Sequence, residues 1–108
     1  MGRVETFDYS LIMSASDVAR YLLDTCQTLR FFESFMFGSS LLGVGSDYDI
    51  LIVGPSGSLL LQLKAELKLA GAELPLDILY MLPMEANETC FVANQKCISL
   101  KHLAASVS

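Results

Sequence analysis

The sequence predicts an α/β (α+β) fold in which helices and strands alternate within one compact unit. Stretches with the 3.6-residue periodicity of amphipathic helices alternate with short apolar stretches that end at glycine or proline. No repeat, linker or low-complexity tract interrupts this order, which is typical of one α/β unit. The chain has 108 residues, the length of one domain, and we expect residues 1–108 to form it.

The first predicted helix and the first predicted strand occupy residues 14–30 and 31–37. Side chains in residues 14–30 recur at helical spacing and form one stripe, which comprises Val18, Tyr21, Leu22, Thr25, Cys26 and Leu29. Ser14 or Ser16 can cap this helix. Residues 31–37, FFESFMF, are aromatic and apolar, too short for a helix and followed by glycine, so they predict a strand.

The remaining elements continue the alternation. Residues 48–54, YDILIVG, predict a second strand because they are aliphatic and the turn sequence GPSG closes them. Residues 58–70 place leucine and alanine on one face and predict a helix. Residues 74–82, LPLDILYML, predict a third strand. We expect a short helix over residues 84–95 and a short edge strand over residues 97–100.

The composition limits the classes of partner. Seven Lys and Arg against 12 Asp and Glu give a net charge of −5, so we expect no long nucleic acid. No apolar run approaches the roughly 18 residues of a membrane-spanning helix and no secretory signal is recognisable, so we expect a cytoplasmic protein that binds no membrane. Hydrophobic residues make up 53% of the chain, which favours a homo-oligomer or a hetero-complex.

Three aspartates in the predicted strands are candidates for a site. Asp47 and Asp49 flank one residue where the strand of residues 48–54 begins, and alternate residues of a strand share a face. Asp77 lies inside an apolar strand, where an ionised side chain is costly unless something compensates it. If the two strands are neighbours, the three acids share a face and offer the all-oxygen ligand set that suits Mg²⁺.

Structural roles are the alternative for these acids. Asp47 and Asp49 also fit two solvated acids at the beginning of a strand. Asp77 also fits an acid that caps a backbone group or pairs with a basic residue. The residues alone leave both alternatives open.

The turn between the first two predicted strands, GSSLLGVGSD, is rich in glycine. Gly38, Gly43 and Gly45 let the backbone approach a ligand, and a helical turn from Ser39 would point N–H groups at a phosphate. An ordinary glycine-rich connection is the alternative, because the turn matches neither GxxxxGK[ST] nor GxGxxG.

Taken together, FGSSLLGVGSDYDILIV and LPLDILY resemble the nucleotidyltransferase core of the DNA polymerase beta superfamily. The resemblance covers residues 15–83 and rests on motifs in the order of that core: Gly38-Ser39, Asp47-Tyr48-Asp49 and Asp77. The small size makes the chain similar to the minimal nucleotidyltransferases of bacteria and archaea. The resemblance therefore implies the DNA polymerase beta-like core, a mixed sheet flanked by helices.

The resemblance also implies an activity and a site. It implies a transferase that moves a nucleoside monophosphate, with AMP from ATP as the expected case, to a hydroxyl of a protein or a small molecule. Asp47 and Asp49 would bind two Mg²⁺ ions, and Asp77 would bind the ion beside the acceptor hydroxyl. Nucleotide-binding residues would be Gly38, Ser39 and Ser46.

Two alternatives to an independent enzyme follow from two departures from the family pattern. Many relatives carry an arginine in the loop after Gly-Ser, whereas no basic residue occurs here over residues 33–63. The chain therefore also fits a binding module with little or no catalysis, such as an antitoxin that covers a helical partner of the HEPN type. A third interpretation ranks after the enzyme and the binding module. The chain shows no additional domain of the kind with which larger relatives hold the base or the acceptor, so it would be the nucleotide-binding half of a larger transferase whose acceptor site lies on another subunit.

Overall fold

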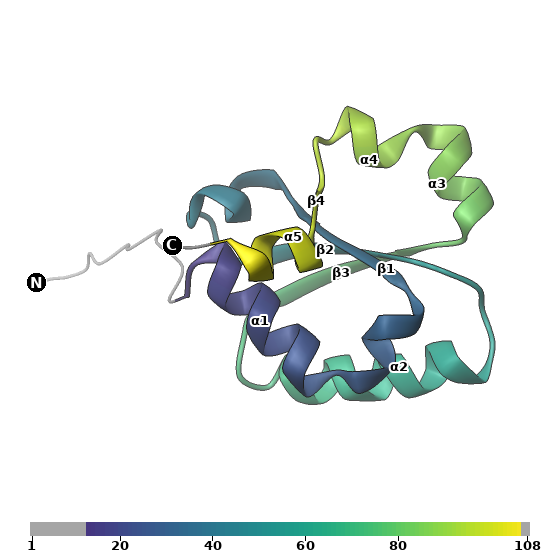
Figure 1. Cartoon of the computed structure of the whole chain (residues 1–108), viewed down its shortest axis with the longest axis horizontal. Coiled ribbons are helices and arrows are strands. Elements are labelled where there is room, and N and C mark those ends of the chain that lie inside the picture. Colours follow the sequence, from purple (N-terminus) through teal and green to yellow (C-terminus); the bar gives the residue numbers. More distant parts are fainter. Residues whose placement is uncertain (1–12, 107–108) are drawn as a thin grey trace, which may run out of the picture.

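The computed structural model describes residues 13–106 and contains a four-stranded sheet surrounded by helices (Figure 1). The strands are β1 (Glu33–Phe37), β2 (Tyr48–Val53), β3 (Leu76–Met81) and β4 (Ile98–Ser99). The α-helices are α1 (Ala15–Thr25), α2 (Ser58–Ala70), α3 (Pro83–Thr89), α4 (Phe91–Asn94) and α5 (Leu100–Ala105). Two short 3₁₀ helices are η2 (Gln27–Phe31) and η3 (Gly38–Leu42).

The sheet is mixed, as expected from the family resemblance, with the strand order β3-β2-β1-β4. β1 is antiparallel to both β2 and β4, and η3 with its following loop connects β1 to β2. β2 and β3 are parallel, and α2 makes the crossover between them. This arrangement leaves β3 at one edge of the sheet, with β2 as its neighbour.

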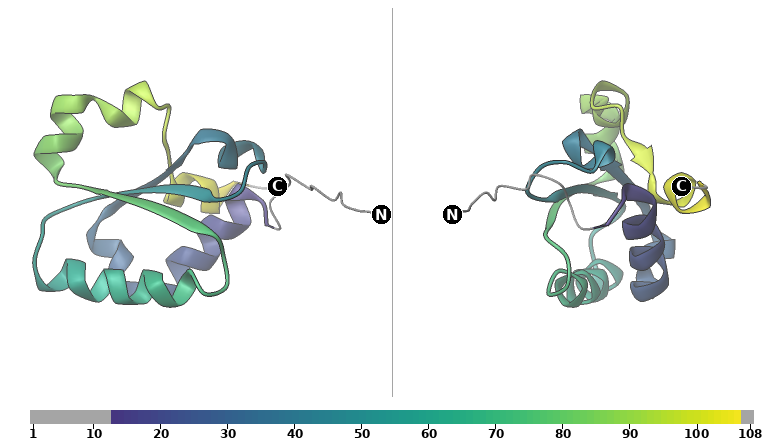
Figure 2. Two further views of the ribbon diagram at one scale, coloured as in Figure 1. Left: turned by 180° about the vertical axis from the view of Figure 1, so that it is seen from behind. Right: turned by 90° about the vertical axis from the view of Figure 1, so that its left-hand side faces the viewer.

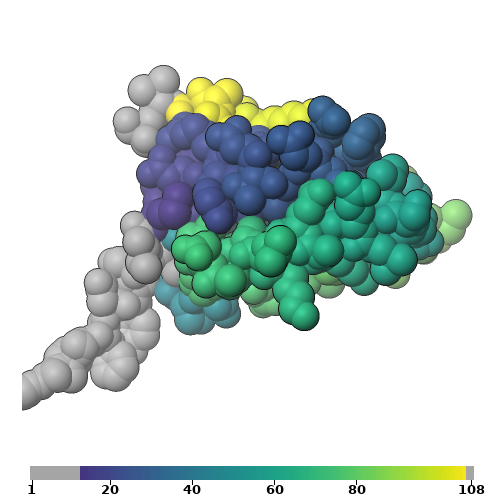
Figure 3. Space-filling model, turned by 90° about the horizontal axis from the view of Figure 1, so that it is seen from below, coloured from purple at the N-terminus to yellow at the C-terminus, as the bar shows by residue number. Residues whose placement is uncertain are grey.

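One face of the sheet carries the hydrophobic core. α1 and α2 lie beneath this face (Figures 1 and 2), and Figure 3 shows them side by side from below. Alternate side chains of β1 and β2 enter the core, where they meet the buried faces of the two helices. The sheet contributes Met36, Tyr48, Ile50 and Ile52, and α2 contributes Leu63, Leu67 and Ala70.

The opposite face is covered less completely. α3 and α4 form an arch over it (Figure 2), and Phe91 of α4 packs edge-on against Phe37 of β1, with ring centroids 5.2 Å apart. Asp49 and Asp77 point to this second face, because their strand neighbours Tyr48 and Ile50 belong to the core. The candidate acids therefore lie outside the core.

The first helix is shorter than predicted. The α-helix ends at Thr25, and Cys26 leaves helical geometry (φ −101°, ψ 85°) before η2 begins. Glu66 of α2 explains this end, because its carboxylate accepts hydrogen bonds from the backbone N–H of Thr28 at 3.0 Å and from Thr28 Oγ1 at 2.8 Å. This contact across the fold stabilises η2, and the strand consequently begins at Glu33 instead of residue 31.

The C-terminal elements also differ from the prediction. The helix predicted over residues 84–95 is divided into α3 and α4 at Cys90, whose positive φ of 52° breaks the helical path. The strand predicted over residues 97–100 is limited to β4, because Ser99 caps α5 by accepting a hydrogen bond from the His102 N–H. α5 packs against α1 and closes the core beside β1.

Within residues 13–106, none of the helices has both the length and the apolar character that crossing a bilayer requires.

Candidate carboxylate site

Asp49 and Asp77 are direct neighbours across two parallel strands. The register of β2 and β3 places Asp49 opposite Asp77, and opposite residues of paired strands point to the same face. Neighbouring strands lie about 4.8 Å apart, so the two carboxylates are within a distance where like charges interact. The sequence prediction that these two acids share a face is confirmed.

Asp47 lies just before β2 and adds a third negative charge. Its side chain is exposed and accepts a 3.5 Å hydrogen bond from Ser46 Oγ. Partial burial raises the pKa of Asp49 above its ordinary value, and the charges of Asp77 and then Asp47 raise it further. Both other acids therefore oppose the ionisation of Asp49.

The turn of η3 holds the backbone of Asp49 in place. The buried Ser40 hydroxyl accepts a hydrogen bond from the Asp49 N–H at 3.1 Å and donates one to the Phe37 carbonyl at 2.8 Å. Ser40 was not among the site residues predicted from the sequence. A serine just after a strand often bonds back to the backbone three residues earlier, but the bond to Asp49 depends on the fold.

Gly38 lies against the carboxylate of Asp49. Its φ is +74°, and a Cβ built on it would come within 2.7 Å of Asp49 Oδ2. Gly45 has φ +106° and lies against Ser39, because a Cβ built on Gly45 would come within 2.8 Å of Ser39 Oγ. Glycine suits the positive φ at both positions, and an added Cβ would require the Asp49 carboxylate or the Ser39 hydroxyl to shift.

The structure corrects the sequence-based account of Asp77. We expected its ionised side chain to need compensation among Leu, Ile and Tyr, but the residue is exposed. Because β3 is an edge strand and its second face is open at this point, water hydrates the carboxylate. The cost of burial therefore gives no reason to place a cation beside Asp77.

The donor set fits Mg²⁺ in chemistry but is not gathered into a complete ligand group. Asp47, Asp49 and Asp77 supply only carboxylate oxygens, and a cation would offset the charge repulsion that raises the pKa of Asp49. However, no three His, Cys, Asp or Glu side chains within residues 13–106 are arranged to hold a metal ion. The metal-ligand role of the three aspartates stays a prediction.

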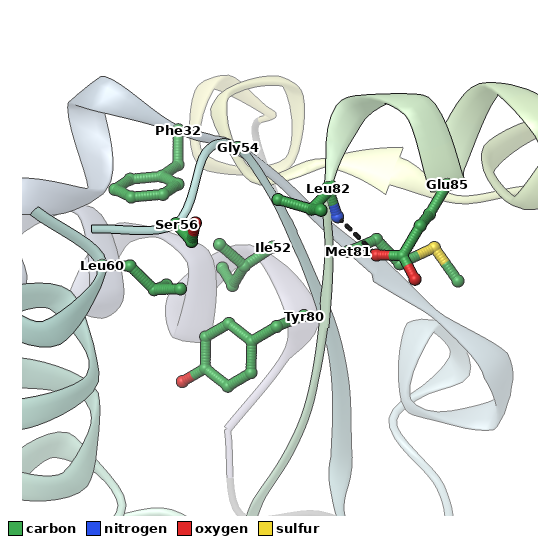
Figure 4. A pocket seen from close by; sticks show the side chains of 9 residues that line it. All are labelled: Phe32, Ile52, Gly54, Ser56, Leu60, Tyr80, Met81, Leu82 and Glu85. Atoms are coloured by element: carbon green, nitrogen blue, oxygen red, sulfur yellow. Dashed lines mark hydrogen bonds between the residues drawn. The ribbon is translucent and has the colours of Figure 1, made fainter.

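The described cavities lie away from the acids. A pocket of about 190 Å³ lies where β2 and β3 end, and it is almost entirely apolar (Figure 4). Its lining includes Phe32, Gly54, Leu60 and Tyr80, and Figure 4 shows the Leu82 N–H donating to the Glu85 carboxylate at its margin. A groove of about 570 Å³ lies under α3 and α4. Neither contains Asp47, Asp49 or Asp77.

The fold and the site together define an α/β domain with a carboxylate pair on the open face of a mixed sheet. Comparisons with models of protein families, with curated proteins and with solved structures give no match to this chain.

Proposed function

We propose that the chain is a minimal nucleotidyltransferase of the DNA polymerase beta superfamily. In this proposal it moves a nucleoside monophosphate, AMP from ATP, to a hydroxyl of a protein or a small molecule in the cytoplasm. The observation that carries the proposal is the register of Asp49 with Asp77, with Asp47 close enough to raise the pKa of Asp49. Gly38-Ser39 lies beside this group in the order that the family motif requires.

Each residue has a role in the proposal. Asp47, Asp49 and Asp77 would hold Mg²⁺, which supplies charge neutralisation for the triphosphate and activation of the acceptor hydroxyl. Gly38 leaves space beside the carboxylate of Asp49, so a phosphate can approach the start of η3. Ser39 of η3 and Ser46 of the loop that follows it are exposed residues, and in the proposal their hydroxyls bind phosphate oxygens.

Transfer of label from α-labelled ATP tests this activity. With Mg²⁺ present, we expect label to appear on an acceptor from the source cell extract or on the chain itself. Asp49→Asn and Asp77→Asn should each lower transfer at least about 100-fold, because removing a metal ligand costs that much or more. Asp24→Asn, an exposed acid on α1, is the matched control and should keep full transfer. Undiminished transfer in both site variants would exclude the proposal.

A binding module is the second candidate, and two observations favour it. No basic residue over residues 33–63 is available to hold a triphosphate. Leu42, 81% exposed at the end of η3, and the exposed Val44 just after it offer apolar surface to a partner beside the acids. The partner would be a helical protein of the HEPN type or a substrate-binding subunit, in a hetero-complex.

The two candidates differ in how complex formation depends on the acids. For a binding module, co-purification with the partner should survive Asp49→Asn and need no nucleotide, whereas Leu42→Glu should abolish it. If neutralisation of the partner instead requires both ATP and Asp49, the chain acts as an enzyme.

A further inference from the structure

The outer edge of β3 carries unpaired backbone groups. The Tyr48 N–H donates to the Pro75 carbonyl and the Gly54 N–H donates to the Met81 carbonyl, so these carbonyls face β2. Because bonds to one neighbour alternate along a strand, the N–H and C=O groups of Leu76, Ile78 and Tyr80 point to the outer side. β3 ends the strand order, and no described strand pairs with that side.

A groove runs beside this edge on the core face of the sheet. It has a volume of about 440 Å³ and lies between β3 and α2. The side chains of Leu76, Ile78 and Tyr80 form its apolar floor, and Lys64 and Lys68 stand on its α2 wall. The Lys64 ammonium lies over the Tyr80 ring at 4.9 Å. Within residues 13–106 neither lysine forms an ion pair.

We propose that the β3 edge binds an extended acidic segment of another protein, which adds to the sheet as an antiparallel strand with alternate glutamates directed at Lys64 and Lys68. Exposed strand edges are bound in this way because the backbone supplies hydrogen bonds and alternate side chains supply specificity. The inference does not depend on the carboxylate site, since the lysines and the acids lie on opposite faces of the sheet.

The spacing of the lysines matches that of an added strand. Lys64 and Lys68 are four residues apart on α2, which corresponds to about 6 Å along the helix axis. Alternate residues of a strand are about 6.8 Å apart, so two glutamates on one face can reach both lysines. A glutamate also suits the groove itself, because its stem can cover the apolar floor while its carboxylate meets an ammonium group.

A second copy of this chain fits the edge less well. Two-fold pairing of β3 with itself would bring α2 of both copies to one face, so Lys64 and Lys68 would approach the same lysines of the other copy. Each copy also carries a net charge of −5, which adds to the repulsion. A foreign acidic strand removes the conflict between the lysines, because its glutamates meet Lys64 and Lys68 with the opposite charge.

A synthetic hexapeptide of alternating Glu and Val, matched to the six residues of β3, is a direct probe. We expect it to shift the backbone amide NMR signals of Leu76, Ile78 and Tyr80. A peptide of alternating Lys and Val should shift none of them. If the Glu-Val peptide leaves these three signals unchanged, or if the free protein is a dimer with these amides in its interface, the proposal is wrong.

Backbone methylation separates strand addition from simple charge attraction. In an antiparallel pair the glutamates that face α2 also turn their N–H groups toward β3, whereas the valine N–H groups point away. Methylation of the glutamate amide nitrogens should therefore abolish binding, and methylation of the valine nitrogens should be tolerated. Equal binding of the two methylated peptides would overturn the proposal.

The contribution of the lysines is measured with one charge-reversal variant and one control. Lys68→Glu should weaken binding of the Glu-Val peptide about fivefold or more, because it removes one ion pair and puts a repelling charge in its place. Lys101→Glu makes the same change in net charge at an exposed position of α5 and should change affinity less than twofold. An equal effect of both variants would show that net charge, and not the groove, attracts the peptide.

Discussion

At the scale of single residues, Asp49 is the carboxylate whose ionisation the other two acids oppose. Its carboxylate accepts no hydrogen bond from any described residue, and its neighbours are Asp77 on β3 and Asp47 at the beginning of β2. Burial and these two charges all favour the protonated form and raise its pKa. The chain thus places a negative charge where its own structure opposes it, a pattern that is typical of functional sites.

Asp77→Asn should lower the pKa of Asp49. The substitution removes the larger of the two charge effects but not the burial, so the pKa should fall part of the way to its ordinary value of about 3.9. Titration of the Asp49 side-chain carbon signal by NMR measures this change. Asp24→Asn should leave the Asp49 titration where it is, and an unaltered pKa in Asp77→Asn would contradict the geometry.

Asp49→Asn should make the protein more stable at neutral pH. Because the pKa of Asp49 is higher in the folded state than in the unfolded state, its contribution to stability is present below about pH 3.9 and is lost as the pH rises through the raised value. The free energy of unfolding of the variant should therefore exceed that of wild type at pH 7 and equal it at pH 3. Urea unfolding at the two pH values measures it, and a variant less stable than wild type at pH 7 would refute this account.

Gly38→Ala and Gly43→Ala form a matched pair. Both glycines have φ near +75°, so each alanine should cost about 1 to 2 kcal/mol of unfolding free energy. A Cβ at Gly38 would meet Asp49 Oδ2, whereas one at Gly43 would meet nothing within 4 Å. Only Gly38→Ala should therefore alter the Asp49 titration. Chemical denaturation tests the cost in stability, and NMR titration tests the effect on Asp49. An Asp49 titration that Gly38→Ala leaves unchanged, as Gly43→Ala should, would contradict the predicted contact.

At the scale of elements, the η3 turn connects the glycine-rich loop to the acids. Ser40 makes this connection through its two hydrogen bonds, one to β1 and one to β2. Since the hydroxyl is buried, its loss leaves the Asp49 N–H without that partner in a site that water reaches poorly.

Ser40→Ala should therefore lower the free energy of unfolding by about 1 to 3 kcal/mol and speed hydrogen exchange at the Asp49 amide. Ser39→Ala, at the neighbouring exposed position, should cost no more than about 0.5 kcal/mol. Denaturant unfolding with amide exchange distinguishes the two variants. If they lose equal stability, Ser40 does not hold the turn.

Elements whose boundaries depend on local sequence were predictable, and those that depend on distant contacts were not. The stripe on α2 and the apolar strands β2 and β3 follow from periodicity and from flanking glycine and proline. The end of α1 depends on Glu66, which lies 38 residues from Thr28 in the chain. The break at Cys90 requires a positive φ that this residue type rarely adopts.

The candidate site was predictable to a similar extent. The shared face of Asp49 and Asp77 follows from strand alternation once β2 and β3 are neighbours. The exposure of Asp77 does not follow, because an apolar strand at a sheet edge has the same sequence pattern as one at the centre. The role of Ser40 also required the fold.

At the scale of the whole molecule, the sheet separates two surfaces. One face packs on α1 and α2, and the edge of β3 beside α2 presents Lys64 and Lys68 in a chain of net charge −5. The other face presents the aspartates between the η3 loop and β3. A nucleotide at the acids and a strand at the β3 edge could therefore bind at the same time.

The central claim is that Asp47, Asp49 and Asp77 bind a divalent cation together, and Mn²⁺ tests it most directly. Mn²⁺ replaces Mg²⁺ at oxygen sites and broadens the NMR signals of nearby nuclei. We predict that a small fraction of an equivalent broadens the amide signals of these three residues first, in wild type and in Asp24→Asn, but not in Asp49→Asn or Asp77→Asn. Broadening centred on other acids, such as Glu85 and Glu88 of α3, or broadening that both site variants retain, would contradict the claim.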